Sequence, residues 1–555
     1  MYRKKNGRER KLKYDFRCYT DQNDTFVVVE KDTVLTWKGY YVTLALEVYD
    51  MKTILAFDLG TSGVKCSLYS VNGTLLGAEY GEYETYYPHA DWREQNPLDW
   101  IEQIKLACRK LTTAAPDAQI CGIGVSGHSL GALPVDADGQ LLVERIPIWS
   151  DARAGIQAQR FFEKVDHREW YETTGNGFPA HLYSLFKIMW YQDNAPQVYN
   201  DACSFIGSKD FVNLYLTGVM ATDHSYASGC GIYDLKSGTY RADFAEAAGV
   251  DIAKFPKIYP SHAIIGHVTA QAAAQLGIPE GTPVVAGGVD NACMALGAGC
   301  FEDGDTYSSL GSSAWITATT DSPVVDYDSM VYTFAHCVPG RFIPSLGIFA
   351  SGSALKWAAD NFFADMQGED RYDRIAELAA GSKAGANGLM FNPCLAGGSS
   401  ADKSPNIRGC LFNLSLGNTK EDVARAVFEG IAMHLYATGM PLIRSGKLGN
   451  RLLVVGGGAK GEFNRQIYAD VFGKEVAVSR VRQDAASLGA AALAAVGCGV
   501  WDSFAPLHEI HRDLTICQPN TDNHAYYEQI LPIYRKLCDA CSDLGDIVSR
   551  TGLLS

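Results

Sequence analysis

The stretch TILAFDLGTSG, residues 53–63, interrupts an apolar run with a carboxylate and a flexible turn. Residues 54–57 are typical of a short buried strand, but the run ends abruptly at Asp58. The turn that follows is made of Gly60, Thr61, Ser62 and Gly63. VKCSLYSVNG then resumes an apolar pattern, so the stretch predicts two strands joined by a turn with accessible backbone N–H groups.

A turn of this kind suits phosphate oxygens, because its N–H groups are not covered by bulky side chains. Asp58, at the end of a buried strand, suits a magnesium ion, held through water because Mg²⁺ dehydrates reluctantly. The alternative is a hairpin whose aspartate only satisfies the amides of the turn.

A second stretch, GDTYSSLGSSAWITATT, residues 304–320, repeats the same plan of strand, turn and strand. Its turn carries Gly311, Ser312 and Ser313. Two such turns facing each other across a cleft would hold a triphosphate from both sides. The repeat therefore favours the phosphate interpretation over the simple hairpin.

The chain of 555 residues is long enough for more than one domain. From Met51 onward short apolar strands alternate with helical stretches, such as PLDWIEQIKLACRKLTTAA, which predicts an α/β fold with a sheet covered on both faces. We expect a first domain over residues 51–300, a second over 304–500, and a helical tail over 501–555. The active site is expected in the cleft between the two domains.

The first fifty residues differ from the rest of the chain. MYRKKNGRERKLKYDFR carries eight Lys or Arg, whereas the net charge of the whole chain is −15. Met51 stands directly before the first predicted strand. We interpret residues 1–50 as a disordered arm or a mis-assigned start, and a nucleic-acid or localisation tail is the alternative.

VVAGGVDNACMALGAG, residues 284–299, contains the predicted catalytic residue. Asp290 follows a buried strand and two glycines, and phosphoryl transfer to a hydroxyl needs a carboxylate that accepts the hydroxyl proton. The alternative is that Asp290 caps the helix that follows. Local pattern alone leaves both roles open.

Three further segments supply candidate ligand-binding residues. GGGAKGEFNRQ follows a buried strand, and Gly457 and Gly458 allow a flat ring or a ribose to approach closely, unless the segment is a plain tight turn. His128 follows another buried strand and could point into the same cleft. Trp149 and Arg153 could line a sugar pocket or make a surface ion pair.

The composition narrows the classes of partner and compartment. The acidic net charge argues against nucleic acid as the main partner, and no apolar run reaches the length of a membrane span. Fifteen scattered cysteines favour a reducing cytoplasm. One C-x-x-C, Cys538 and Cys541, lies in a predicted helix, where a metal or redox role is the less favoured interpretation.

The ordered set of motifs resembles the FGGY carbohydrate kinases over nearly all of residues 51–500. The resemblance rests on DLGTSGVK, WREQNPLDW, IPIWSDARA, TGN, SKDFVNLYLTG, TDHSYASG, GGVDNA, LGSSAWI, VVGGGAKGEFNRQIYADVFG and ASLGAAALAAVG. It implies two actin-like (ribonuclease H-like) ATPase domains. It also implies transfer of the γ-phosphoryl group of ATP to a hydroxyl of a small sugar, with Mg²⁺.

The resemblance also implies roles for individual residues. Asp58 matches the aspartate associated with magnesium and ATP, and Asp290 matches the catalytic base, with Asn291 near the sugar. The phosphate turns match Gly60, Thr61, Ser62, Gly311, Ser312 and Ser313. The adenosine side matches Gly457, Gly458, Ala459 and Asn464.

Within the family the pattern is most similar to the xylulokinases, but two segments depart from it. Where those enzymes have S-G-Q-M-H-G, this chain has Ser126 to Gly131 with His128 in place of the glutamine and Leu130 in place of the histidine. Where the family often has G-E-R-x-P, this chain has AGGSSADKSP, residues 396–405. Because a site built to bind a hydroxyl discriminates strongly, the first exchange could change the substrate.

We therefore expect an ATP- and magnesium-dependent kinase of a pentulose such as xylulose, with ATP and a small sugar as its partners. A hexulose, a polyol or a sugar acid remains an alternative substrate, and a homodimer is compatible with the sequence. An actin-like ATPase without a sugar site is disfavoured because it would not need Asp290 in GGVDNA or the pocket-forming N-terminal segments. A silent sugar-binding regulator is disfavoured because Asp58 and Asp290 are both present.

Overall fold

The computed structural model describes residues 52–399, 401–478, 481, 484–512 and 514–551. Of residues 1–51 it describes only the backbone of five short strands, β1 (Tyr2–Lys5), β2 (Arg8–Lys11), β3 (Arg17–Thr20), β4 (Thr25–Glu30) and β5 (Thr33–Lys38). The hypothesis of an arm or a mis-assigned start over residues 1–50 lies largely outside the described residues and stays a prediction.

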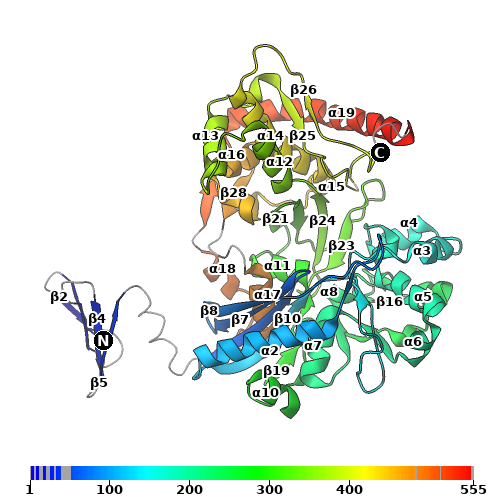
Figure 1. Cartoon of the computed structure of the whole chain (residues 1–555), viewed down its shortest axis with the longest axis vertical. Helices are drawn as coiled ribbons and strands as arrows, with labels where there is room; N and C mark the ends of the chain where they lie inside the picture. Colours follow the sequence, from blue (N-terminus) through cyan, green and yellow to red (C-terminus); the bar gives the residue numbers. More distant parts are fainter. Residues whose placement is uncertain are drawn as a thin grey trace.

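The first domain is built on a seven-stranded sheet in the order β18-β19-β10-β6-β7-β8, with β20 beside β10 (Figure 1). Its strands are β6 (Lys52–Leu59), β7 (Gly63–Ser70), β8 (Leu75–Glu82), β10 (Gln119–Gly127), β18 (Ile264–His267), β19 (Pro283–Val285) and β20 (Gly288–Val289). β6 runs parallel to β10 and antiparallel to β7. The apolar residues 54–57 are buried on both faces of this sheet, which explains why they form a continuous run.

Helices cover both faces of this sheet. One face packs against α2 (Pro97–Ala114), α7 (Ser208–Thr217) and α10 (Ala270–Leu276). The other face packs against α11 (Asp290–Gly297) and α17 (Ala485–Gly497). The predicted helix and strand at PLDWIEQIKLACRKLTTAA and ICGIGVSG are confirmed as α2 and β10.

α17 comes from late in the chain but lies on the first domain, next to β10 in Figure 1. A Cβ atom added to Gly124 would lie 2.0 Å from the carbonyl oxygen of Ala490, and one added to Gly489 would lie 1.9 Å from that of Cys293. The backbones touch here, so only glycine fits. α17 thus lies within the residues predicted for the second domain, 304–500, but packs on the sheet of the first.

The rest of the first domain is a layer of short elements around the sheet. The strands are β9 (Glu94–Gln95), β11 (Leu133–Val135), β12 (Ile146–Pro147), β13 (Ser204–Ile206), β14 (Ala221–Asp223), β15 (Tyr233–Asp234), β16 (Thr239–Tyr240) and β17 (Lys257–Tyr259). The helices are α3 (Gly155–Phe162), α4 (His167–Thr174), η1 (Ala180–Leu182), α5 (Ser184–Asn194), α6 (Pro196–Asp201), α8 (His224–Ala227), α9 (Ala242–Ala248) and η2 (Ile252–Lys254).

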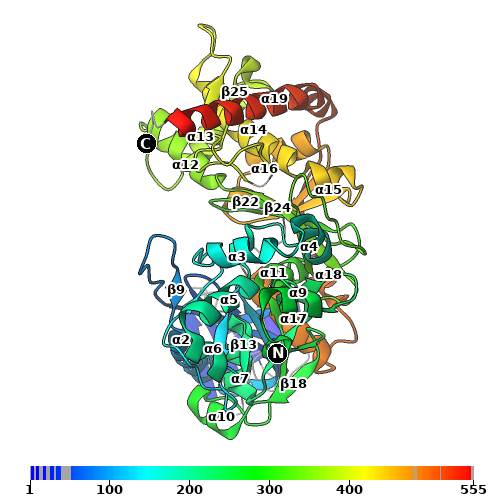
Figure 2. The same ribbon diagram turned by 90° about the vertical axis from the view of Figure 1, so that its right-hand side faces the viewer.

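The second domain has its own seven-stranded sheet, in the order β23-β24-β22-β21-β27-β28-β29. Its strands are β21 (Thr306–Leu310), β22 (Ala314–Ala318), β23 (Tyr332–Ala335), β24 (Phe342–Ile348), β27 (Arg451–Val455), β28 (Glu475–Val478) and β29 (Thr515–Cys517). Its core lies between this sheet and α12 (Gly352–Phe362), α13 (Arg371–Ala380), α14 (Lys420–Thr438), α16 (Glu462–Phe472) and α19 (Thr521–Thr551). Figure 2 shows α19 lying across the outer end of this domain.

The remaining elements of the second half of the chain are short. They are η3 (Ala386–Gly388), β25 (Met390–Asn392), β26 (Cys410–Phe412), α15 (Met440–Arg444), η4 (Gly457–Ala459) and α18 (Pro506–Ile510). Residues near α18 return to the first domain, since the indole N–H of Trp501 donates a hydrogen bond to the carbonyl of Val71.

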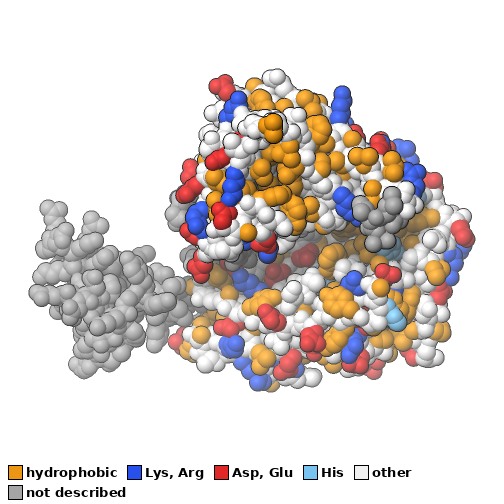
Figure 3. All heavy atoms as spheres, turned by 45° about the horizontal axis from the view of Figure 1, so that its top comes forward, with side chains coloured by type: hydrophobic (Ala, Val, Ile, Leu, Met, Phe, Trp, Pro, Cys, Tyr) orange, Lys and Arg blue, Asp and Glu red, His pale blue; other side chains and the backbone are white. Residues whose placement is uncertain are grey.

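The two domains meet along β23 and enclose a groove. The N–H of Thr333 donates to the carbonyl of Gly175 at 2.8 Å, and the hydroxyl of Tyr171 donates to the carbonyl of Val331 at 2.8 Å. Figure 3 shows the surface hollowed between the two domains, with acidic side chains visible inside the hollow. Among the described residues, no helix is both long enough and apolar enough to cross a membrane.

Candidate active site

Asp58 lies at the carboxyl end of β6, where two neighbouring strands bring polar side chains beside it. The register pairs Asp58 with Ser126 on β10 and with Lys65 on β7. The Ser126 hydroxyl donates to the Asp58 carboxylate at 2.9 Å, and the Lys65 ammonium forms an ion pair with Asp484, just before α17. Burial raises the pKa of Asp58, and the Ser126 hydrogen bond and the Lys65 charge partly oppose that shift.

Asp290 follows β20, whose residue Val289 pairs with Gly127 at the end of β10. It is the first residue of α11, whose N-cap position is Val289, and its carboxylate accepts a hydrogen bond from the N–H of Asn291 at 2.7 Å. Burial and the nearby charge of Asp58 raise the pKa of Asp290 to about 7. A carboxylate with such a pKa is suited to accept a proton near neutral pH.

Each domain presents one of the two predicted glycine turns. The N–H of Gly60 donates to the carbonyl of Gly63 at 3.0 Å, and the N–H of Gly311 donates to that of Ser313 at 2.9 Å, so each turn is a tight loop between antiparallel strands. Within the described chain, four N–H groups of the turns make no hydrogen bond: Thr61, Ser62, Ser312 and Ser313. These free donors fit the phosphate groups of a nucleotide.

The third glycine segment lies beside the turn of the second domain. β27 runs parallel to β21, and a Cβ atom on Gly456 would lie 2.7 Å from the carbonyl oxygen of Leu310. Gly456 also has a φ of +90°, so the segment needs glycine there. A Cβ atom on Gly457 would meet nothing within 4 Å, so that position has room for a ligand.

Two other residues of this segment support it. The carboxamide of Asn464 donates to the carbonyl of Gly458 at 2.7 Å, so Asn464 holds the turn in shape. Ala459 is buried, and its carbonyl accepts a hydrogen bond from the guanidinium of Arg465 at 2.8 Å. The structure thus places both residues in the scaffold of the segment.

The carboxylates near the end of β6 fit a magnesium ion. Asp58, Asp290 and Asp484 supply only oxygen donors, which Mg²⁺ prefers, and Lys65 is a cation that acts on Asp58 and Asp484. Three carboxylates against one ammonium leave a negative balance that a divalent cation would compensate. The role of Asp58 as the residue that would hold Mg²⁺ through water stays a prediction.

Two of the predicted sugar residues lie where a sugar could reach them. The Trp149 side chain is exposed, and its indole N–H donates to the hydroxyl of Thr61 at 3.0 Å, so it stands next to the first phosphate turn. The carboxamide oxygen of Asn291, next to Asp290, is buried, and no partner for it is found in the described part of the chain. An unpaired buried acceptor fits a hydroxyl that arrives with a ligand.

His128 and Arg153, the other two predicted sugar residues, have buried side chains, and a sugar role for His128 stays a prediction. His128 is 1% exposed, and its ring packs edge-on against Trp100 at 5.3 Å between centroids. Burial, more than the nearby charge of Lys187, lowers the pKa of His128 to about 4. Neighbouring side chains cover the ring, although neither ring nitrogen has a partner in the described part of the chain, so a sugar could contact it only after a rearrangement.

The side chain of Arg153 is also buried. Its guanidinium donates to Asp151 at 2.7 Å and to Glu94 at 2.7 Å, and it stacks on the Trp92 ring at 3.8 Å. The side chain is 3% exposed. It therefore belongs to a buried ion-pair network, and neither the sugar-pocket nor the surface-pair interpretation describes it.

Leu130, which replaces a histidine of the family pattern, has an unusual backbone. Its φ is +60°, a left-handed conformation that is rare for a leucine, and its side chain is buried. The Lys187 ammonium donates to the carbonyls of Leu130, Ile148 and Leu182 at 2.9, 2.7 and 2.7 Å. Lys187 thus holds the Leu130 loop and the strand end before Trp149.

Sequence reasoning missed Lys65, Lys187 and Asp484. Lys65 could have been found, because the hairpin register across the first turn puts it opposite Asp58. Asp484 and Lys187 could not be found from local sequence. The partner of Asp484, Lys65, lies 419 residues away along the chain, and Lys187 binds the carbonyl of Leu130, 57 residues away.

Two family models cover most of the described chain. Residues 53–297 match the N-terminal domain of the FGGY family of carbohydrate kinases, and residues 306–498 match its C-terminal domain. A xylulose kinase of Staphylococcus epidermidis is 32% identical over 491 residues, which is 88% of this chain and 96% of that protein. A gluconokinase of Bacillus subtilis is 28% identical over 497 residues, which is 87% of this chain and 95% of that protein.

A solved structure gives the same family relation in three dimensions. The xylulose kinase from Rhodospirillum rubrum superimposes with a TM-score of 0.81 at 27% sequence identity, over 89% of this chain and all of that one. The predicted two-domain actin-like α/β fold and the predicted phosphotransferase class are confirmed. This chain belongs to the FGGY family of carbohydrate kinases.

Proposed function

We propose that this kinase transfers the γ-phosphoryl group of ATP to a hydroxyl of a pentulose such as xylulose. The observation that carries the proposal is the pair Asp58 and Asp290, which lie at the ends of β6 and β20 on either side of β10 and interact electrostatically. The similarity to xylulose kinases supports the pentulose.

Positioning of ATP would come from both domains. The free N–H groups of Thr61, Ser62, Ser312 and Ser313 would bind phosphate oxygens. The open space at Gly457 would accept the adenosine. A magnesium ion held at Asp58 through water would neutralise charge on the phosphates.

Proton transfer would be the task of Asp290. Its carboxylate would accept the proton of the attacking sugar hydroxyl while the oxygen attacks the γ-phosphorus in line. Asn291 would accept a hydrogen bond from another hydroxyl, and Trp149 would cover the sugar beside Thr61. Closure of the domains would exclude water, which would otherwise accept the phosphoryl group.

A sugar acid such as gluconate is the second candidate, and one observation favours it. The position of the family histidine is filled by the buried, apolar Leu130, so the hydrogen bond that the histidine offers to a sugar is missing. A gluconokinase also matches over nearly the same share of the chain.

The test is a coupled ADP-release assay with Mg-ATP against matched panels of pentuloses, hexuloses, polyols and aldonic acids. We expect the highest kcat/KM with a pentulose. A value at least about tenfold higher with an aldonic acid would replace the pentulose, because one well-made hydrogen bond is worth about that factor. Sugar-independent ADP release that no panel member stimulates would contradict kinase function itself.

A further inference from the structure

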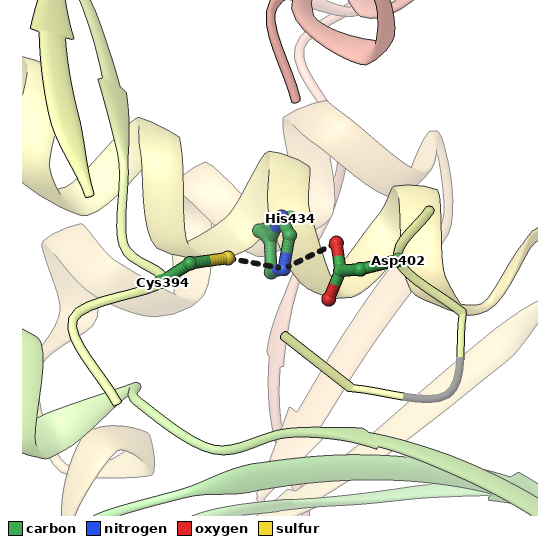
Figure 4. Close-up of side chains that lie close together, drawn as sticks. All are labelled: Cys394, Asp402 and His434. Carbon is green, nitrogen blue, oxygen red and sulfur yellow. Dashed lines mark hydrogen bonds and ion pairs between the residues drawn. The ribbon is translucent and has the colours of Figure 1, made fainter. Parts of the chain in front are cut away.

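The second domain contains a cluster of side chains of the types that bind metal ions, and the proposed kinase reaction does not use it. Cys394, Asp402 and His434 point toward one another (Figure 4), and one ligand atom from each lies within 4.8 Å of the others. Cys394 and His434 are buried, at 3% and 3% exposure. The group lies where α14, which carries His434, packs near α19.

Two of the three residues come from the segment after β25, which includes AGGSSADKSP, where the chain departs from its family pattern. Asp402 belongs to that stretch, and its Oδ2 accepts hydrogen bonds from the N–H of Ser399 at 2.7 Å and from its hydroxyl at 3.0 Å. The other oxygen, Oδ1, lies 3.5 Å from Nε2 of His434. The N–H of Cys394 is held by the side chain of Asn392 at 3.0 Å, so both ligands sit on a fixed backbone.

Two of the three distances between the ligand atoms are close to those of a tetrahedral zinc site. Sγ of Cys394 lies 3.2 Å from Nε2 of His434, and Nε2 lies 3.5 Å from Oδ1 of Asp402. Ideal bond lengths to Zn²⁺ would place S and N about 3.6 Å apart, and N and O about 3.4 Å apart. The sulfur and the carboxylate lie within 4.8 Å of each other, where about 3.6 Å is ideal, so side-chain movements of up to about an ångström would bring the three atoms around one ion.

We propose that Cys394, Asp402 and His434 form a binding site for a zinc-class transition metal ion. A thiolate, an imidazole and a carboxylate suit Zn²⁺, whereas Mg²⁺ prefers oxygen ligands alone, so this site would not compete for the magnesium of the nucleotide. Coordination uses the Cys394 thiolate and an unprotonated Nε2, so binding releases protons to solvent.

The surroundings supply a partner for the imidazole ring of His434 and space for a fourth ligand. Sγ of Cys538, in the C-x-x-C of α19, lies 3.8 Å from the other imidazole nitrogen, Nδ1, and so orients the ring. A pocket of about 20 Å³ opens beside Asp402 and His434, which is room for one water molecule as fourth ligand. Lys403 and Arg535 also line this pocket. Lys403 is paired with Asp543, which reduces its repulsion of a cation.

The competing interpretation is a hydrogen-bonded trio without metal. Burial lowers the pKa of His434, but hydrogen bonds with Asp402 and Cys394 outweigh it and raise that pKa well above its ordinary value. In that state a proton on Nε2 occupies the place of the ion. The two interpretations exclude each other and differ in what happens when metal is added.

The experiment titrates Co²⁺, whose sulfur charge-transfer absorption reports a bound thiolate, into chelator-treated full-length protein. We expect one equivalent to bind with that absorption, and Zn²⁺ to displace it. Cys394→Ser should remove the absorption, and the isosteric Asp402→Asn should weaken binding at least about tenfold. Cys541→Ser is the matched control. The Cys541 thiol, on α19 like Cys538, lies 3.3 Å from the sulfur of Cys410 and is not part of the cluster, so this variant should bind Co²⁺ like wild type.

Two results would overturn the site: folded wild type that binds no stoichiometric Co²⁺, or an absorption that survives in Cys394→Ser. The second would assign the metal to other cysteines. Neither result depends on which sugar the kinase phosphorylates, because binding is measured without substrate. A rise in Tm with Zn²⁺ in wild type but not in Asp402→Asn provides a second measurement on the same question.

Discussion

The two glycine turns of the molecule share a backbone plan but differ in the side chains around them. Asp58 in the first domain corresponds to Ser309 in the second, since each stands two residues before the glycine of its turn. Opposite Asp58 is Lys65, and opposite Ser309 is Trp315. On the parallel neighbour, Asp58 meets Ser126, whereas Ser309 meets Val455.

The difference separates two tasks that the repeat alone would assign to both domains. Both turns offer free N–H groups to phosphates, but only the first has a carboxylate, Asp58, with a second carboxylate, Asp290, at the end of a strand on the far side of β10. We infer that both domains bind the nucleotide, and that the first domain also carries out the chemistry.

Separate substitutions at the two corresponding positions, Asp58 and Ser309, should give the largest contrast in activity. Asp58→Asn should lower kcat about 100-fold or more, because it removes the charge that would hold the magnesium ion beside the transferring phosphate. Ser309→Ala should change kcat less than about threefold, since the serine carries no charge. Steady-state kinetics of the purified variants measure both, and equal losses at the two positions would contradict the division of tasks.

The next effect concerns Lys65, which has no charged counterpart in the second domain. Lys65→Met should lower activity about tenfold at neutral pH, because Asp58 and Asp484 lose their shared cation and the pKa of Asp58 rises further. The loss of activity at falling pH should then begin at a higher pH than in wild type. Lys110→Met, which breaks an exposed ion pair with Glu79, is the control and should leave the pH profile unchanged.

The turns themselves should respond alike. A Cβ atom on Gly60 or Gly311 would meet only a backbone oxygen, at 3.4 and 3.5 Å, so alanine fits the fold at both positions. Its methyl group would crowd the phosphates, and the KM for ATP should rise several-fold in both variants. A rise at one turn alone would show that only that turn binds the nucleotide.

Gly456 and Gly155 provide matched comparisons for those alanines. Gly456→Ala should lower the Tm, because φ is +90° and the Cβ atom would lie 2.7 Å from the carbonyl oxygen of Leu310. Gly155→Ala, at the first residue of α3, meets nothing within 4 Å, so it should leave the KM unchanged and keep or slightly raise the Tm.

The smallest effect concerns the loops that belong to the first domain alone. Lys187→Met removes the ammonium that ties the Leu130 loop to the strand end before Trp149. The KM for the sugar should rise about threefold, while the KM for ATP should not change. Lys164→Met, on the exposed surface, is the control, and equal changes in both KM values would argue against a role in sugar binding alone.

Lys187 also makes stability depend on pH in a defined direction. Burial lowers its pKa to about 7 from an ordinary value of 10.5. Between these values the unfolded chain binds more protons than the folded one, so this lysine makes folding more favourable as pH rises from about 7 to 10.5. Comparison of Tm over that range should show a smaller pH dependence in Lys187→Met than in wild type.

Much of the fold could be predicted because each pattern lies within a short stretch of sequence. The buried run before Asp58, the repeat of its plan at residues 304–320 and the helix after Asn96 all form as expected. The sequence did not predict that α17 packs on the first sheet. Its glycines and alanines are explained only by a strand and a helix from elsewhere in the chain.

The candidate site shows the same limit. Asp58, Asp290 and the glycine turns follow strands, and strand ends gather at one edge of a sheet, so their grouping could be predicted. Whether a side chain faces the cleft or the core could not, because that depends on packing partners. His128 against Trp100 and Arg153 between Asp151 and Glu94 are the two cases in which burial decided otherwise.

The most direct test of Asp290 as the proton acceptor is to measure sugar-dependent ADP release by wild type and Asp290→Asn across pH. ATP affinity is measured in parallel. Since the pKa of Asp290 is raised to about 7, wild-type activity should fall as pH decreases through about 7 and the carboxylate becomes protonated. The variant should be about 100- to 10,000-fold slower at every pH, with unchanged ATP affinity. A variant within a few-fold of wild type, or a wild-type profile flat through pH 7, would contradict Asp290 as the group that accepts the proton.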